Sequence, residues 1–248
     1  MQNDKVLNAV TWNPWHGCHK CSAGCKNCFV FYQDRRYGRN TDVVSIGKTT
    51  YRLKNCPAGS VVKLCFSSDF FIEEADEWRD DIWDTIRNRD DCTFVITTKR
   101  PERIIECLPE DWGDGWNNFK LNISVENQEM ADIRILYLLK APVKYRGIFC
   151  APLIGKIELG KYLDIGLIDC VNVGGEHAPL YDVRPTDFKW VGGLFLEAKE
   201  RGIEFYFHQT GSKLISDGRN IGAWNMKEQI KNAEILQKEL ERLYECSN

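Results

Sequence analysis

The sequence has 248 residues, of which 43% are hydrophobic and 28% are charged. This composition supplies enough apolar side chains for a sizeable core and excludes a disordered chain. The formal net charge of -3 and the pI near 5.9 exclude a global positive field for binding nucleic acid, but they leave room for a local basic patch.

The N-terminal segment MQNDKVLNAVTW lacks the long apolar core of a signal peptide. No run of the sequence approaches the roughly eighteen apolar residues of a membrane span. We therefore expect a cytoplasmic protein with no membrane partner. Thiols stay reduced in the cytoplasm, so cysteines that cluster in this sequence indicate a metal or redox site rather than a disulfide framework.

Short apolar, β-branched runs alternate with amphipathic stretches along the chain. The segment AVTW at 9–12 is read as a first strand, and six clearer strands follow it. We predict these six strands at residues 60–66, 92–98, 120–125, 144–150, 167–175 and 203–209. We predict helices at residues 74–88, 100–108, 127–140, 186–202 and 225–245. Thr186 is the expected N-cap of its helix, and Gly202 is its expected stop.

Alternation of strands and helices predicts a parallel sheet and the α/β class. The simplest fold is a partial (β/α) barrel of six to seven parallel strands with a C-terminal helix. A doubly wound open sheet is the alternative. The sequence has no long linker, internal repeat or low-complexity tract, so we interpret residues 1–248 as a single domain.

Polar or glycine-rich segments follow nearly every predicted strand. They are SSD at 67–69, TKR at 98–100, EN at 126–127, GGEH at 174–177 and HQ at 208–209. In α/β barrels and open α/β sheets, active sites form at the carboxyl ends of the strands. The sequence therefore predicts a functional site at this edge.

Four cysteines stand close together in the loop 16–29, as Cys18-x2-Cys21-x3-Cys25-x2-Cys28. A structural zinc site normally separates two Cys-x2-Cys pairs by a dozen or more residues, whereas three residues separate them here. Iron–sulfur clusters accept closely spaced thiolates from one loop. We therefore favour an iron–sulfur cluster and keep zinc as the alternative.

The other cysteines stand alone or lie in apolar runs, where a buried thiol acts as a small hydrophobe. We expect plain thiols at Cys56, Cys65, Cys92, Cys107, Cys150, Cys170 and Cys246.

The spacing Cys21-x3-Cys25-x2-Cys28 resembles that of the radical S-adenosylmethionine (radical SAM) superfamily. The resemblance implies that three cysteines hold a [4Fe–4S] cluster and that SAM binds its open iron. An electron from the cluster would then cleave SAM and yield a 5′-deoxyadenosyl radical. An external electron donor is a further implied partner.

A resemblance over nearly the whole chain rests on TWNPWHGCHK, GCKNCFV, TTKRPER, ISVENQ, APLIG, VNVGGE and FYFHQTG. These segments are similar to the phage- and mobile-element-associated radical-SAM-like family of unknown function. That family implies Cys18, Cys25 and Cys28 as ligands, whereas the superfamily spacing implies Cys21 in place of Cys18. We expect Cys18 to be the third ligand and leave Cys21 open.

The superfamily resemblance also suggests residues that bind SAM. Gly174, Gly175 and Glu176 have the composition that contacts the methionine amino group, although Ser67, Ser68 and Asp69 occupy the usual second-strand position. Alternatively, Glu176 is a loop carboxylate that caps the next helix.

Other candidates follow the remaining strands. Lys99 and Arg100 would bind the SAM carboxylate or a substrate phosphate. The ribose hydroxyls would contact Asn122, Ser124 and Glu126. Glu176, His208 and Gln209 are the candidates for catalytic roles on the substrate side, and His16 and His19 flank Cys18.

Three functions are compatible with the sequence. The first is a radical SAM enzyme that modifies a nucleotide or a nucleic-acid base, which the phage resemblance favours. Because the net charge is negative, we expect a free nucleotide or a substrate delivered by a partner protein. The alternatives are radical SAM modification of a peptide or protein, and a non-catalytic iron–sulfur or zinc protein that binds nucleic acid.

Overall fold

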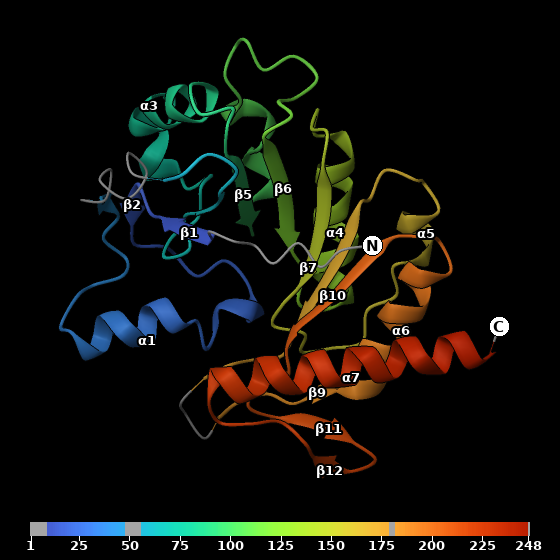
Figure 1. Ribbon diagram of the computed structural model, residues 1–248. Coiled ribbons are helices and arrows are strands. Elements are labelled where there is room, and N and C mark those ends of the chain that lie inside the picture. The colour runs from blue at the N-terminus through green and yellow to red at the C-terminus, as the bar shows by residue number, and fades with distance from the viewer. Residues whose placement is uncertain (1–8, 48–55, 179–181, 248) are drawn as a thin grey trace. The chain divides into compact units, whose positions relative to one another are not determined.

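A computed structural model describes residues 9–47, 56–178 and 182–247 (Figure 1). Residues 1–8, which include most of the segment inspected for a signal peptide, lie outside the described part. Seven strands form one sheet in the order β1-β4-β5-β6-β7-β8-β10. They are β1 (Ala9–Trp12), β4 (Val61–Leu64), β5 (Thr93–Thr98), β6 (Phe119–Ser124), β7 (Arg146–Cys150), β8 (Cys170–Gly174) and β10 (Glu204–Gln209).

The predicted fold class is confirmed: the sheet is parallel and curls as in a partial barrel, and the chain ends in a helix. The segment AVTW forms β1 and pairs with β4. The helices are α1 (Phe29–Arg36), α3 (Asp76–Arg87), α4 (Gln128–Lys140), α5 (Gly160–Leu163), α6 (Phe188–Lys199) and α7 (Met226–Ser247). Short strands β2 (Trp15–His16) and β3 (Ser45–Ile46) form a separate pair, and β9 (Thr186–Asp187), β11 (Leu214–Ser216) and β12 (Arg219–Asn220) form a small third sheet.

Two local predictions are wrong. Residues 100–108 form two 3₁₀ turns, η3 (Pro101–Arg103) and η4 (Ile105–Cys107), instead of a helix. The segment is too short for a stable α-helix, and Pro109 disfavours helical backbone in the residue before it. Thr186 lies in β9, and the N-cap of α6 is Asp187, whose side chain accepts a hydrogen bond of 2.9 Å from Lys189 N.

Contacts along the chain divide it into two compact units. The first contains residues 1–20, 30–123 and 140–146, and the second contains 21–29, 124–139 and 147–248. Each unit is described by itself, and the interpretation of 1–248 as one domain stays a prediction.

The core of the first unit is built around the indole of Trp83 in α3. Its ring centroid lies 4.8 Å from that of Phe70 and 5.2 Å from that of Trp112. Trp83 is 1% exposed, and its Nε1–H donates to Cys107 O at 2.8 Å. The buried ring and its satisfied polar atom therefore tie α3 to the end of η4.

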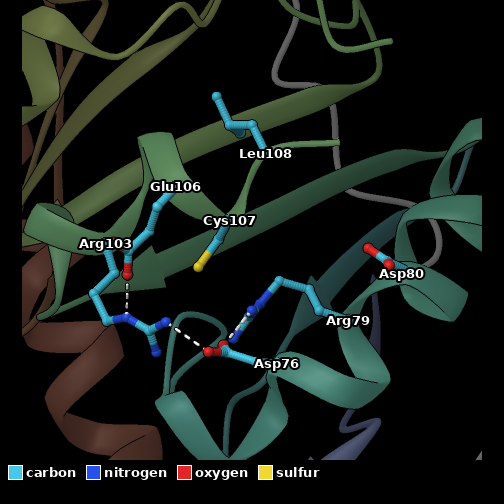
Figure 2. A pocket seen from close by; sticks show the side chains of 7 residues that line it. All are labelled: Asp76, Arg79, Asp80, Arg103, Glu106, Cys107 and Leu108. Carbon is cyan, nitrogen blue, oxygen red and sulfur yellow. Dashed lines mark hydrogen bonds and ion pairs between the residues drawn. The ribbon is translucent and has the colours of Figure 1, made fainter. Parts of the chain in front are cut away.

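A second tie in the first unit is a pair of arginines on one carboxylate. The Asp76 carboxylate lies between the guanidinium groups of Arg79 and Arg103 (Figure 2). Arg79 is 4% exposed and also donates to Phe70 O at 3.1 Å and Ile72 O at 2.8 Å. Burial of this charge is tolerated because each of the three guanidinium nitrogens donates to an acceptor.

In the second unit, α6 packs on β8 and β10, and α7 packs on β10 (Figure 1). Gln237 of α7 accepts from Phe207 N at 2.8 Å and donates to Phe205 O at 3.2 Å. Its side chain thus satisfies backbone groups at the edge of the sheet, where unpaired groups would favour association with another strand. In the described residues, no helix combines the length and the apolar character needed to cross a membrane.

The buried position of Arg79 makes its loss costly. We expect Arg79→Met to lower the free energy of unfolding by about 3 kcal/mol, because two buried carbonyls lose their donor. Urea unfolding of the variant beside the parent measures this loss. The control is Asp80→Asn, whose side chain is exposed beside Arg79 and should leave stability unchanged. Equal stability of Arg79→Met and the parent would contradict this account.

Candidate functional site

In the first unit, Asp69 organises the loops that follow β4 and β5. Its carboxylate accepts from Thr98 Oγ1 at 2.7 Å and from Lys99 N at 2.9 Å, and it lies 3.3 Å from Arg100 Nη1. Asp69 is 5% exposed, so these bonds form in a largely dry environment. The polar segments after two neighbouring strands are thus brought together, as predicted, but Asp69 binds the protein itself.

Arg100 connects Asp69 to the cysteine segment of the same unit. Its Nη1 lies 3.7 Å from Cys18 Sγ, and its Nη2–H donates to His19 O at 2.9 Å. Cys18 is half-buried. Arg100 therefore places a positive charge beside the Cys18 sulfur.

His16, Ser67 and Asp34 form a chain of hydrogen bonds in the first unit. His16 Nδ1 lies 3.0 Å from Ser67 Oγ, and its Nε2 lies 2.8 Å from the buried carboxylate of Asp34. Ser68 Oγ donates to Gly17 O. The two serines therefore hold the backbone and side chains that flank Cys18, and His19 contacts Glu74.

The three residues predicted for the ribose are buried. Asn122 donates to Ile96 O at 3.3 Å within the first unit. Ser124 donates to Ala151 O at 2.8 Å within the second. The exposed fractions of these two side chains are 5% and 1%, and that of Glu126 is 0%.

Glu126, two residues past β6, holds the cysteine loop of the second unit. Its Oε1 accepts from Gly24 N at 3.0 Å, and its Oε2 accepts from Arg134 Nη1 at 2.9 Å. Arg134 comes from α4, is 4% exposed and also donates to Ser124 O at 2.7 Å. A Cβ at position 24 would lie 2.9 Å from the Glu126 carboxyl carbon, so this close approach requires glycine.

Arg134 also reaches a thiol. Its Nη2 lies 4.0 Å from Cys21 Sγ, and Cys21 Sγ lies 4.0 Å from Cys25 Sγ. Cys21 is exposed, whereas Cys25 and Cys28 are half-buried. The loop therefore binds the protein interior through the Gly24 amide, while its sulfurs lie near the surface.

Glu176, two residues past β8, holds the same loop at a second point. It accepts from Asn27 Nδ2 at 2.8 Å and from Arg184 N at 2.9 Å, and it pairs with the Arg184 guanidinium. Arg184 Nη1 donates to Ala23 O at 2.8 Å. Burial alone would raise the pKa of Glu176, but the hydrogen bonds from Arg184 and Asn27 outweigh it and lower that pKa below its ordinary value.

Gly174 and Gly175 lie directly before Glu176, beside the residues that end β10 and follow it. Neither Gly174 nor Gly175 has a positive φ. A Cβ at Gly175 would lie 2.3 Å from Thr210 O, so the close neighbour is the backbone after β10. Gly211 in that backbone has φ +74°. Glycine at 175 therefore allows two loops to pack together.

Gln209 and His208 end β10. The Gln209 side chain donates to Gly175 O and accepts from Gly211 N, which joins the loops after β8 and β10. His208 is exposed, and its Nε2 lies 2.7 Å from Asn172 Oδ1.

Six of the seven cysteines outside the loop are buried, and Cys246 is exposed. Cys65 and Cys150 are buried, and burial raises the pKa of both thiols. Across residues 9–47, 56–178 and 182–247, no three His, Cys, Asp or Glu side chains are arranged to hold a metal ion.

A family model described as "Protein of unknown function (DUF5131)" matches residues 6–242. The chain belongs to this family. No curated protein and no solved structure was found to match it.

For this DUF5131 member, the sequence alone did not indicate the groups that hold the cysteine loop. They are Gly24, Asn27, Arg134 and Arg184. Arg134 lies in a helix between Ile133 and Ile135, and Arg184 lies in a loop, so neither stands out by spacing. Gly24, directly before Cys25, carried the one available signal, since a glycine there permits close backbone approach.

The lowered pKa of Glu176 gives a pH test. The ionised carboxylate stabilises the folded chain above its ordinary pKa of about 4.3, and this contribution disappears as the pH falls through the lower folded value. We expect Glu176→Gln to lose about 1.5–3 kcal/mol at pH 7, and the difference from the parent to vanish in acid. Urea unfolding at stepwise lower pH measures it.

The matched control is Glu200→Gln, whose carboxylate is 61% exposed. It should follow the parent at each pH. A deficit of Glu176→Gln that stays constant from neutral to acid pH would show that the carboxylate charge is not the cause.

Proposed function

We propose that this protein is a radical SAM enzyme. The observation that carries the proposal is the anchored cysteine loop. Two buried carboxylates, Glu126 and Glu176, bind its Gly24 amide and its Asn27 side chain, while Cys25 and Cys28 remain half-buried and Cys21 exposed. The loop is held through its Gly24 amide and its Asn27 side chain, while its thiols stay at least partly accessible. Such a loop suits a cofactor that is inserted after folding.

The donor set fits an iron–sulfur cluster. Cys25 and Cys28 would hold it together with either Cys18 or Cys21, because four thiols within one short loop are typical cluster ligands. When bound, a [4Fe–4S] cluster supplies the electron that cleaves SAM to a 5′-deoxyadenosyl radical. Arg100 and Arg134 lie beside Cys18 and Cys21. Their positive charges would offset part of the negative charge of thiolates bound to a cluster.

The chain's own residues would divide the remaining tasks. Glu176 accepts hydrogen bonds from four donor groups of Asn27 and Arg184, so we assign it to positioning the loop rather than to the SAM amino group. Asp69 positions Thr98, Lys99 and Arg100 in the same way. Ser67, Ser68, Gly174, Gly175 and Lys99 stay candidates for SAM contacts, as do the ribose candidates Asn122, Ser124 and Glu126.

The substrate class that we propose is a nucleotide or nucleic-acid base. The resemblance to phage-associated proteins motivates it, and the net charge of -3 disfavours tight binding to a duplex. A peptide substrate and a non-catalytic metal protein are the competing functions. The first would give SAM cleavage that a peptide stimulates, and the second would give metal content without cleavage.

Anaerobic isolation tests the cofactor. We expect a brown protein with about four irons per chain that reductively cleaves SAM to 5′-deoxyadenosine. Iron analysis, visible and EPR spectra and chromatography of the nucleoside product measure these properties. Stoichiometric zinc with no iron would refute the proposal, and a stable cluster without SAM cleavage would favour the non-catalytic alternative.

Single cysteine variants identify the ligands. Cys25→Ala and Cys28→Ala should each abolish the cluster absorbance, because both thiols belong to either ligand set. Of Cys18→Ala and Cys21→Ala, one should lose the cluster and the other keep it. Cys246→Ala is the control, since this exposed thiol lies far from the loop in the sequence. Full absorbance in Cys25→Ala or Cys28→Ala would contradict the assignment.

A further inference from the structure

Strands β7, β8 and β10 of the second unit have a covered face and an open face. On β10, the Phe205 ring packs against Phe195 of α6, with centroids 5.4 Å apart. Side chains alternate along a strand, so Tyr206 points to the face opposite α6. Tyr206 is 46% exposed, and His208 is exposed as well. Two aromatic side chains of β10 therefore face away from the core.

These side chains belong to a larger aromatic surface. The ring of Phe149, from β7, stacks on that of His208 with centroids 5.2 Å apart and planes 15° apart. The Tyr206 and His208 centroids are 6.1 Å apart. Asn172 of β8 pairs in register with both Phe149 and Tyr206, so it lies between them. Phe149, Tyr206 and His208 are called the aromatic platform below.

The orientation of His208 is specified by the backbone and by a neighbour. Phe207 pairs with Val173 and Gln209 pairs with Gly174, which leaves His208 as an extra residue in β10. Such a bulge re-aims a side chain and occurs often beside functional sites. The His208 Nε2–H donates to Asn172 Oδ1 at 2.7 Å, and Asn172 is only 7% exposed. The exposed imidazole is thus held by a buried amide.

The charge beside the platform limits what it can bind. Glu204 lies on the same face of β10, and its Oε2 is 3.5 Å from the Tyr206 hydroxyl. A carboxylate repels a phosphate but accepts hydrogen bonds from an amine. Aromatic side chains stack on the flat face of any nucleobase. The surface therefore suits a neutral base that carries an exocyclic amine.

We propose that the aromatic platform binds the flat ring of an amino-bearing nucleobase, as a nucleoside or as an unpaired base. His208 and Phe149 lie near the carboxyl ends of their strands, the edge at which Glu126 and Glu176 of the same unit anchor the cysteine loop. The platform would be the substrate-binding surface of the enzyme. Only the reaction that follows binding rests on the proposed function. Binding itself needs no cluster.

Calorimetric titration of cytidine into the full chain, isolated without iron, tests the proposal. We expect the parent to bind cytidine, and Tyr206→Ala and His208→Ala each to weaken binding about tenfold, the size of one lost stacking contact. Tyr206→Phe keeps the ring and should keep the affinity. The control is Trp224→Ala, which removes a 65% exposed aromatic side chain outside these strands.

The proposal would be overturned if the parent does not bind cytidine, or if both alanine variants bind it with the affinity of the parent. So would displacement of cytidine by SAM together with weaker SAM binding in Tyr206→Ala, because the platform would then hold the adenine of SAM. A protein that cleaves SAM but ignores cytidine refutes the platform alone. A protein that binds cytidine on the platform but takes up no iron refutes the radical mechanism alone.

Discussion

The buried ion pair of Glu126 and Arg134 is the interaction on which the cysteine loop of the second unit depends. Glu126 is fully buried, and a buried carboxylate is stable in its charged form only when it is paired and hydrogen-bonded. Arg134 supplies the charge, and Gly24 N supplies a further donor. A side chain at position 24 would clash with the Glu126 carboxylate, so this approach requires glycine.

The same arrangement occurs again at the end of β8. Glu176 is 3% exposed, Arg184 neutralises it, and Asn27 of the cysteine loop donates to it. Parallel strands bring their carboxyl ends to one edge, so loops after β6 and β8 can grip one segment at two points. A single anchor would leave the loop free to pivot, whereas two anchors three residues apart fix both ends of the turn that carries Cys25.

The strand and helix pattern was predictable because apolar periodicity reports burial directly. Segment 92–98 became β5 and segment 127–140 became α4 almost unchanged. The partners of the polar residues were not predictable. Glu126 and Glu176 stood out in the sequence because they follow predicted strands. Their arginine partners come from a helix and a loop, and no spacing rule predicts that these lie close to the carboxylates. A carboxylate at the carboxyl end of a strand therefore gives the same sequence signal whether its partner is a ligand or an arginine of the chain.

These anchored carboxylates change where a ligand can bind in the second unit. Many polar side chains at the strand ends form hydrogen bonds that hold loops in place. Gln209, for example, bonds to Gly175 and Gly211. What stays accessible is the open face of β7, β8 and β10, where exposed rings remain beside a buried amide. The two features would complement each other. The anchors Glu126 and Glu176 fix the position of the cysteine loop, and the aromatic platform offers a fixed plane on which a flat ligand could stack.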